Sequence, residues 1–273
     1  MSKLKDTFRS LLRRAGFELL HRNDDPVLAE LRKLHETLRL ELGNRIRWSD
    51  TLARPAAHAC LRHLLELHRI DLLLDVGANQ GQFAQLARHV GYTGEIVSFE
   101  PLSRYREVLR KAANEDGRWR IIASAVGSQA AELDLNVCAD DSFSSLHTLN
   151  DSARARFGGH VAVDSVERVS VCTLDSLWPE LDQGRGRRVL LKTDTQGHDL
   201  AVLSGASAVL PWTCAVVTEA AIQPIYAGAP RFVEIAAWLE RAGFVLSGVF
   251  PTSHRPEDLS LIEVDAFFTK LRA

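Results

Sequence analysis

The fold is decided by the stretch 72–83, which reads LLLDVGANQGQF. Residues 72–76 are apolar except for Asp75, a pattern that is typical of a buried strand. Gly77 and Gly81 follow, and glycine permits a tight turn and a close approach of a ligand to the backbone. The turn opens onto a helix. Strand, glycine turn and helix in this order predict the cofactor-binding unit of a Rossmann-like α/β sheet.

Strands and helices alternate outward from this stretch. We expect further strands at 95–99, 119–126, 188–194, 214–219, 244–250 and 261–269, and helices at 53–67, 104–115, 198–206 and 232–242. Near-continuous apolar strands separated by helices predict a mostly parallel, twisted sheet with helices on both faces. Residues 51–273 are therefore expected to form the main domain.

Residues 127–187 interrupt the alternation. Two strand-like stretches, 132–139 and 167–174, flank the polar segment 140–160, and no helix is expected between them. An insertion of this length inside a compact domain is usually functional. We expect a small β and loop insertion whose segment 140–160 forms a mobile lid or a wall of the acceptor site.

Residues 1–50 are expected to form a helical extension. Residues 1–22 hold six basic and two acidic side chains, a net charge of +4. Such a helix either makes a peripheral contact with an anionic membrane or presents a solvated face while docked on the main domain, and the second alternative is favoured. The whole chain has a net charge of -2, which gives no general attraction to nucleic acid, so no nucleic-acid partner is expected.

The cysteine pattern and the hydropathy point to the cytoplasm. The four cysteines are far apart and form no CxxC pair, so reduced thiols are expected rather than a disulfide framework or a zinc site. No apolar run approaches the roughly 18–20 residues of a membrane span. A cytoplasmic protein is expected, with membrane association left open by residues 1–22. The sequence does not indicate an oligomeric state.

The chemistry of the glycine turn favours S-adenosylmethionine (SAM) over a dinucleotide. The spacing is G-x-x-x-G, with Asp75 two residues before Gly77, whereas dinucleotide sites use G-x-G-x-x-G. SAM carries a cationic sulfonium and an ammonium group, which an acid suits, and no pyrophosphate, which an acid would repel. Glu100 ends the next strand, where Rossmann-type sites place a carboxylate on the ribose hydroxyls.

At these residues the chain resembles the FkbM family of methyltransferases. The matching stretches are 75–84, 98–101, 124–128, 142–146, 191–206 and 264–268, and the resemblance covers roughly residues 70–270. It implies a class I methyltransferase fold and transfer of a methyl group to a hydroxyl of a sugar, glycan or natural-product acceptor. A common family form has Glu where this chain has Gln196. The implied cofactor contacts are Asp75, Gly77, Asn79, Gly81, Phe83, Glu100, Pro101, Ser124 and Ala125.

The reacting groups are expected at the carboxyl ends of the strands, where open α/β sheets bind ligands. Asp194 and Glu219 end neighbouring strands, and His198 begins the helix after Asp194. A hydroxyl is a weak nucleophile, so a base must take its proton. Either Asp194 or His198 is that base, or Asp194 and Glu219 hold Mg²⁺. The candidate substrate contacts are Ser142, Ser144, Ser145 and Lys192.

Two other functions compete with an O-methyltransferase. An NAD(P)-linked oxidoreductase would share the sheet, although the missing G-x-G-x-x-G argues against it. A non-catalytic SAM-binding scaffold in a glycan-assembly complex would keep the cofactor loop, and its only support is the basic segment 1–22. A thermal shift with SAM but not NAD separates the first rival, and copurification without methyl transfer identifies the second.

Overall fold

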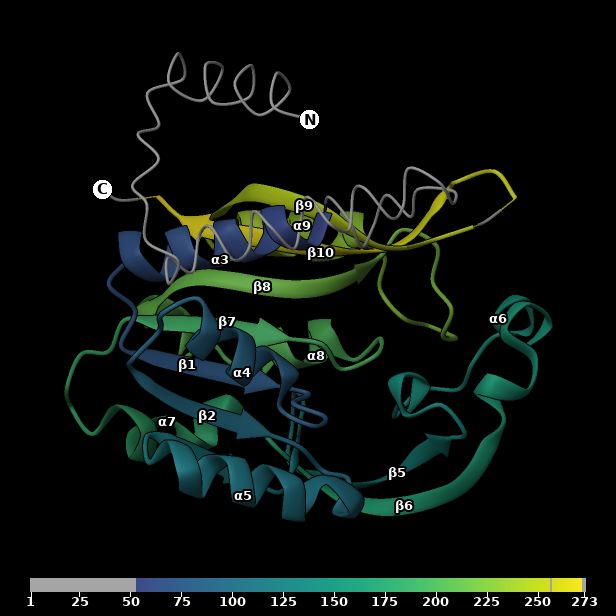
Figure 1. The fold of residues 1–273 in the computed structure, drawn as a ribbon, viewed down its shortest axis with the longest axis horizontal. Coiled ribbons are helices and arrows are strands. Elements are labelled where there is room, and N and C mark those ends of the chain that lie inside the picture. The colour runs from purple at the N-terminus through teal and green to yellow at the C-terminus, as the bar shows by residue number, and fades with distance from the viewer. Residues whose placement is uncertain (1–52, 256, 272–273) are drawn as a thin grey trace, which may run out of the picture. The chain divides into compact units, whose positions relative to one another are not determined.

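The structure is a computed structural model that describes residues 53–255 and 257–271. A seven-stranded sheet forms the centre of this part of the chain (Figure 1). The strand order is β3-β2-β1-β7-β8-β10-β9. Strands β1, β2, β3, β7 and β8 pair in parallel, and β10 is antiparallel to both of its neighbours. The bounds are Leu72–Val76 (β1), Glu95–Phe99 (β2), Trp119–Ile122 (β3), Val189–Thr193 (β7), Thr213–Ala221 (β8), Phe244–His254 (β9) and Leu261–Lys270 (β10).

The sheet order confirms the Rossmann-like class I methyltransferase fold. The chain runs outward from β1 through β2 to β3 and then returns to the other side of β1 with β7. The carboxyl ends of β1 and β7 therefore meet at a switch point, which is where open α/β sheets form their ligand crevice. The expected extension 1–50, and with it the membrane contact through 1–22, lies outside the described residues.

Helices cover both faces of the sheet because successive side chains of a strand point to opposite faces. In β1, Leu73 packs into one apolar cluster, whereas Leu72 and Leu74 pack into the other. The first cluster includes side chains of α3 (Arg54–Leu67), α4 (Gln82–His89) and α5 (Arg106–Asp116). The second includes side chains of α7 (Leu174–Asp182), α8 (Asp199–Ser204) and α9 (Phe232–Arg241).

Two strands of the insertion, β5 and β6, and the short strand β4 just before it form a second sheet in the order β4-β6-β5. The bounds are Ala125–Val126 (β4), Ala131–Cys138 (β5) and Val163–Cys172 (β6). The prediction of a single strand at 119–126 was wrong. This stretch contains β3, which pairs with β2 in the main sheet, and β4, which pairs with β6 in the second sheet. The strand expected at 167–174 ends at Cys172, because Thr173 caps the start of α7.

The segment 140–160 contains a helix that the sequence analysis did not expect. This helix is α6 (Asp151–Phe157), and the 3₁₀ turns η3 (Asp141–Phe143) and η4 (Gly158–Val161) lie on either side of it (Figure 1). The side chain of Asn150 accepts a hydrogen bond from the backbone N–H of Ala153, which caps the helix.

The cysteines and the helices of the described residues bear on the expectations drawn from cysteine spacing and hydropathy. All four cysteines lie among the described residues, and none of them is disulfide-bonded. None of the helices within 53–255 and 257–271 combines the length and the apolar character that crossing a bilayer requires.

Candidate functional site

The turn after β1 requires both of its glycines. Gly77 and Gly81 have φ of +76° and +87°, in the left-handed region. A Cβ atom on Gly77 would lie 1.9 Å from the carbonyl oxygen of Asp194. A Cβ on Gly81 would lie 2.6 Å from the Trp119 ring. The turn therefore packs directly against the end of β7, which brings the cofactor loop to the backbone of Asp194.

Glu100 ties this turn to the end of β2. Its carboxylate is buried. It accepts one hydrogen bond from the backbone N–H of Asn79 at 2.7 Å and another from the backbone N–H of Leu102 at 2.9 Å. Burial raises the pKa of Glu100 to about 7, although these two hydrogen bonds lower it. Each carboxylate oxygen can accept a second hydrogen bond, so Glu100 keeps the capacity to bind a ligand's hydroxyls.

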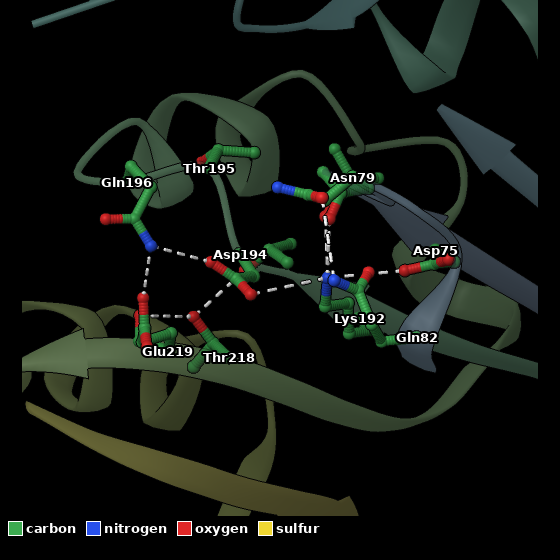
Figure 2. Close-up of polar contacts among 12 residues, drawn as sticks. Asp75, Asn79, Gln82, Lys192, Asp194, Thr195, Gln196, Thr218 and Glu219 are labelled. Atoms are coloured by element: carbon green, nitrogen blue, oxygen red, sulfur yellow. Dashed lines mark hydrogen bonds and ion pairs between the residues drawn. The ribbon is translucent and has the colours of Figure 1, made fainter. Parts of the chain in front are cut away.

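Asp75 and Lys192 form a buried ion pair beneath the turn. They lie opposite each other on the parallel strands β1 and β7, and Lys192 Nζ is 3.3 Å from Asp75 Oδ1 (Figure 2). Lys192 Nζ also donates to the carbonyl oxygen of Gly77 at 2.8 Å, and Ser98 Oγ donates to Asp75 Oδ2 at 2.8 Å. Burial lowers the pKa of Lys192, but the neighbouring carboxylates raise it by more, so its pKa lies above the usual value. The pair holds the shape of the turn from inside the protein.

Asp194 and Glu219 meet at the carboxyl ends of β7 and β8, as the sequence analysis expects. Gln196 joins them, because its Nε2 donates to Asp194 Oδ1 at 3.0 Å and to Glu219 Oε2 at 2.7 Å (Figure 2). Asp194 Oδ2 lies 3.6 Å from Lys192 Nζ, and the Asp194 side chain is 38% exposed. Burial, followed by the charge of Asp194, raises the pKa of Glu219 well above its usual value. The Asp194 carboxylate is therefore partly accessible to a ligand.

The magnesium expectation is not supported. Among the residues that the structure describes, no three His, Cys, Asp or Glu side chains are arranged to hold a metal ion. The group between Asp194 and Glu219 is the amide of Gln196, which presents hydrogen-bond donors to both carboxylates rather than an oxygen ligand to a metal.

His198 lies just before α8 and pairs with a second histidine. Its Nδ1 is 3.1 Å from Nε2 of His147. Burial, followed by the nearby His147, lowers the pKa of His198 to about 4, and burial lowers the pKa of His147 as well. His198 is therefore a neutral imidazole near pH 7, and its low pKa makes it a weaker proton acceptor than an ordinary histidine.

The hydroxyls of the three candidate serines all form hydrogen bonds with other groups of the protein. Ser142 Oγ bonds Asp140, and Ser144 Oγ accepts from the backbone N–H of Cys138. Ser145 Oγ donates to the carbonyl oxygen of Gln196 at 2.6 Å. Of the three, Ser145 is the one that links the segment 140–160 to the Asp194 network.

A cavity of about 420 Å³ lies within the insertion. The segment 140–160 supplies six of its eleven lining residues, and β5 and the stretch after α6 supply the others. The lining residues are Asn136, Cys138, Phe143, His147, Thr148, Leu149, Arg154, Gly158, Val161, Ala162 and Val163.

The remaining cofactor candidates surround the turn or follow β3. The Phe83 ring centroid is 5.6 Å from Lys192 Nζ, and Pro101 directly follows Glu100. Ser124 Oγ is 2.8 Å from the carbonyl oxygen of Ser170, and Ala125 begins β4. No ligand contact is tested for these residues, and they stay predictions.

Sequence reasoning missed the contacts of Gln196, Tyr226 and His147. The Tyr226 hydroxyl donates to Gln196 Oε1 at 2.8 Å, and Tyr226 follows β8 outside any motif. Gln196 lies in the stretch 191–206 that resembles the FkbM family. Its hydrogen bond to Tyr226, thirty positions away, leaves no local signal in the sequence.

The profile described as "Methyltransferase FkbM domain" matches residues 75–246. No curated protein matches the chain significantly. Similar solved structures include a 1,6-didemethyltoxoflavin-N1-methyltransferase from Burkholderia thailandensis with bound S-adenosylhomocysteine (16% identity, TM-score 0.43, covering 93% of this chain and 94% of that one). A second similar structure is fibrillarin from Aeropyrum pernix with bound SAM (14% identity, TM-score 0.42, covering 79% of this chain and 74% of that one). A third is magnesium protoporphyrin IX methyltransferase from Synechocystis with bound SAM (10% identity, TM-score 0.40, covering 93% of this chain and 100% of that one).

Proposed function

This chain belongs to the FkbM family of methyltransferases, and from that premise we propose that it transfers a methyl group from SAM to a hydroxyl oxygen of a sugar, glycan or natural-product acceptor. One observation carries the proposal. The glycine turn, which would bind SAM, packs against the backbone of Asp194, whose carboxylate is partly exposed. A cofactor loop and an accessible proton acceptor thus share the switch point of the sheet.

SAM would lie over the turn 77–81 with its ribose near Glu100. The carboxylate of Glu100 can accept from both hydroxyls of a ribose while it keeps its hydrogen bonds to the backbone. Asp75 is fully buried and faces Lys192 and Ser98. Its proposed part is therefore to shape the turn on which SAM would lie.

Asp194 is proposed as the general base. The acceptor oxygen attacks the SAM methyl carbon in line with the carbon–sulfur bond, which breaks to release S-adenosylhomocysteine, and the hydroxyl proton passes to Asp194. Lys192 and Gln196 contact one Asp194 oxygen each, so the carboxylate is held in place before the acceptor binds. Such alignment is a large part of catalysis, since well-oriented reactions reach effective molarities of about 10⁵–10⁸ M.

The cavity in the insertion is the proposed acceptor site, and His147 in its lining pairs with His198. Its lining combines neutral polar side chains, such as Asn136 and Thr148, with the Phe143 ring. Hydroxyl-rich acceptors need such mixed surfaces, in which a few polar groups fix orientation and apolar groups exclude water. A volume of about 420 Å³ lies within the usual range of small-molecule sites. A monosaccharide, a glycan end or a compact natural product would fit.

The test is turnover of Asp194→Asn against a panel of sugars, glycan fragments and polyketide alcohols, with mass spectrometry of the methylated product. The amide keeps the shape but cannot accept a proton at neutral pH, so turnover should fall by about 10²-fold or more while SAM affinity stays nearly intact. The matched control is Asp164→Asn, because Asp164 is exposed on β6. Wild-type turnover of Asp194→Asn would refute the assignment of the base.

His198→Ala separates the second candidate for the base. If the loss of turnover equals that of Asp194→Asn, the imidazole takes the proton and Asp194 only orients the site. Methylation of an amine in preference to every hydroxyl in the panel would contradict O-methyl transfer.

A further inference from the structure

The side chain of Gln196 lies in the gap where a metal ion would bridge Asp194 and Glu219. Its Nε2 is 3.0 Å from Asp194 Oδ1 and 2.7 Å from Glu219 Oε2 (Figure 2). A primary amide nitrogen carries two protons, so each carboxylate receives one. We propose that the Gln196 amide takes the place of a metal ion in this site and holds the two carboxylates together without one.

The hydrogen bonds fix which end of the amide faces the carboxylates. With the opposite orientation, the amide oxygen would face two carboxylate oxygens, and three acceptors would meet without a donor. In the observed orientation Gln196 Oε1 accepts from the Tyr226 hydroxyl at 2.8 Å. Both donors and the acceptor of the amide are therefore used.

The backbone holds Gln196 in place for this task. Gln196 has φ of +53°, in the left-handed region, and Gly197 follows with φ of +93°. The Ser145 hydroxyl donates to the Gln196 carbonyl oxygen at 2.6 Å. A non-glycine residue keeps such a conformation only where its surroundings impose it. The side chain is thus pre-positioned, and its supports come from the segment 140–160 and from the residues after β8.

The second oxygen of Asp194 also has a partner in the protein. Lys192 Nζ lies 3.6 Å from Asp194 Oδ2, so one oxygen of Asp194 faces a buried cation and the other faces the Gln196 amide. A divalent cation needs several oxygen ligands, most of them ionised carboxylates or carbonyls. Among the described residues, the carboxylates that Gln196 contacts are those of Glu219 and Asp194, and both already accept its protons.

Replacing the amide by a carboxylate would reverse this situation. Gln196→Glu would place an acidic oxygen within hydrogen-bond distance of both Asp194 and Glu219. Three carboxylates around one point form a hard oxygen site of the kind that binds Mg²⁺ or Mn²⁺. A metal site should therefore appear in this variant, although the wild-type chain has none there.

The experiment is a titration of the full chain with Mn²⁺, followed by electron paramagnetic resonance of the free ion. Gln196→Glu should bind one Mn²⁺ saturably below about 1 mM, and the wild-type chain should not. Adding Glu219→Gln to this variant should abolish the binding. The matched control is Gln183→Glu, because Gln183 is also left-handed, with φ of +50°, but is exposed at the end of α7. This control should bind no more Mn²⁺ than the wild type.

Two results would overturn the proposal. One is wild-type binding of Mn²⁺ that Asp194→Asn removes, and the other is a folded Gln196→Glu variant that binds none. If that variant does not fold, NMR of the wild-type chain decides, since Mn²⁺ below about 1 mM should leave the Gln196 side-chain amide signals unbroadened. Selective broadening of those signals would contradict the proposal. The proposal implies that methyl transfer needs no metal ion, and this implication rests on the proposed function. Turnover of Asp194→Asn tests the proposed function separately from Mn²⁺ binding.

Discussion

Replacing Glu100 by glutamine tests the cofactor site at its most specific contact. The two carboxylate oxygens accept from the backbone N–H groups of Asn79 and Leu102. Glutamine has one acceptor oxygen, so its NH₂ group would face one of these donors. A buried donor without an acceptor costs about 1–3 kcal/mol, and the turn that should carry SAM would lose part of its support.

The expected loss of SAM affinity follows from these contacts. A hydrogen bond to a charged group contributes about 1.5–3 kcal/mol, and each tenfold change in affinity corresponds to about 1.4 kcal/mol. Losing one such bond to the ribose should weaken SAM binding by roughly 10- to 150-fold.

The raised pKa of Glu100 adds a pH signature. Burial raises this pKa to about 7, and the ionised form is the one that accepts from both ribose hydroxyls. SAM affinity should therefore rise as the pH increases through about 7 in the wild type, and Glu100→Gln should remove this component. By the same shift, the contribution of the Glu100 carboxyl to the stability of the free protein is complete below its unfolded pKa and is lost as the pH rises through about 7.

The assay is calorimetric titration with SAM below, at and above neutral pH. Glu107→Gln is the matched control, since Glu107 is exposed on α5, and it should bind SAM as the wild type does. If folded Glu100→Gln binds SAM with wild-type affinity, the ribose assignment is wrong.

Three further predictions follow. Gly77→Ala should abolish SAM binding in calorimetry and lower the unfolding temperature, because its Cβ would lie 1.9 Å from the carbonyl oxygen of Asp194; normal binding would show that the turn does not carry the cofactor. Lys192→Met leaves Asp75 buried without its cation and should lower the free energy of unfolding in urea by about 3–5 kcal/mol; a loss below about 1 kcal/mol, typical of exposed pairs, would contradict the buried pair. Hydrogen exchange in residues 140–160 should slow when SAM and acceptor bind, and equal exchange with and without them would argue against a lid or acceptor wall.

The main sheet could be predicted because its strands carry their own signal. The strands at 72–76 and 95–99 have the bounds that the sequence analysis gave, since buried parallel strands are nearly continuous apolar runs. The apolar run 119–126 shows the limit of this signal. It contains two strands that pair with different partners, and pairing across sheets leaves no trace in local hydrophobicity.

The two helices inside the insertion were not predicted because their own sequences carry a weak signal. α6 and α7 have seven and nine residues, and two turns of helix give little periodicity. Their caps, Asn150 and Thr173, were the available signals, because both side chains accept from the first turn of the helix.

The candidate site divides in the same way. Asp194 and Glu219 could be placed together because parallel strands end at the same edge of the sheet. The partner of Asp75 could not, because Lys192 is 117 residues away and faces it only through the register of β1 and β7. The roles of Gln196 and Tyr226 depend on a side-chain network between separate loops, which no spacing in the sequence encodes.

The cofactor assignment is tested most directly by calorimetric titration of the wild-type chain with SAM and, separately, with NAD⁺. The account predicts one SAM bound per chain, because the turn 77–81 has the spacing and the neighbouring acids of a SAM site, and no heat from NAD⁺. Binding of NAD⁺ without binding of SAM would contradict the account and favour the oxidoreductase alternative.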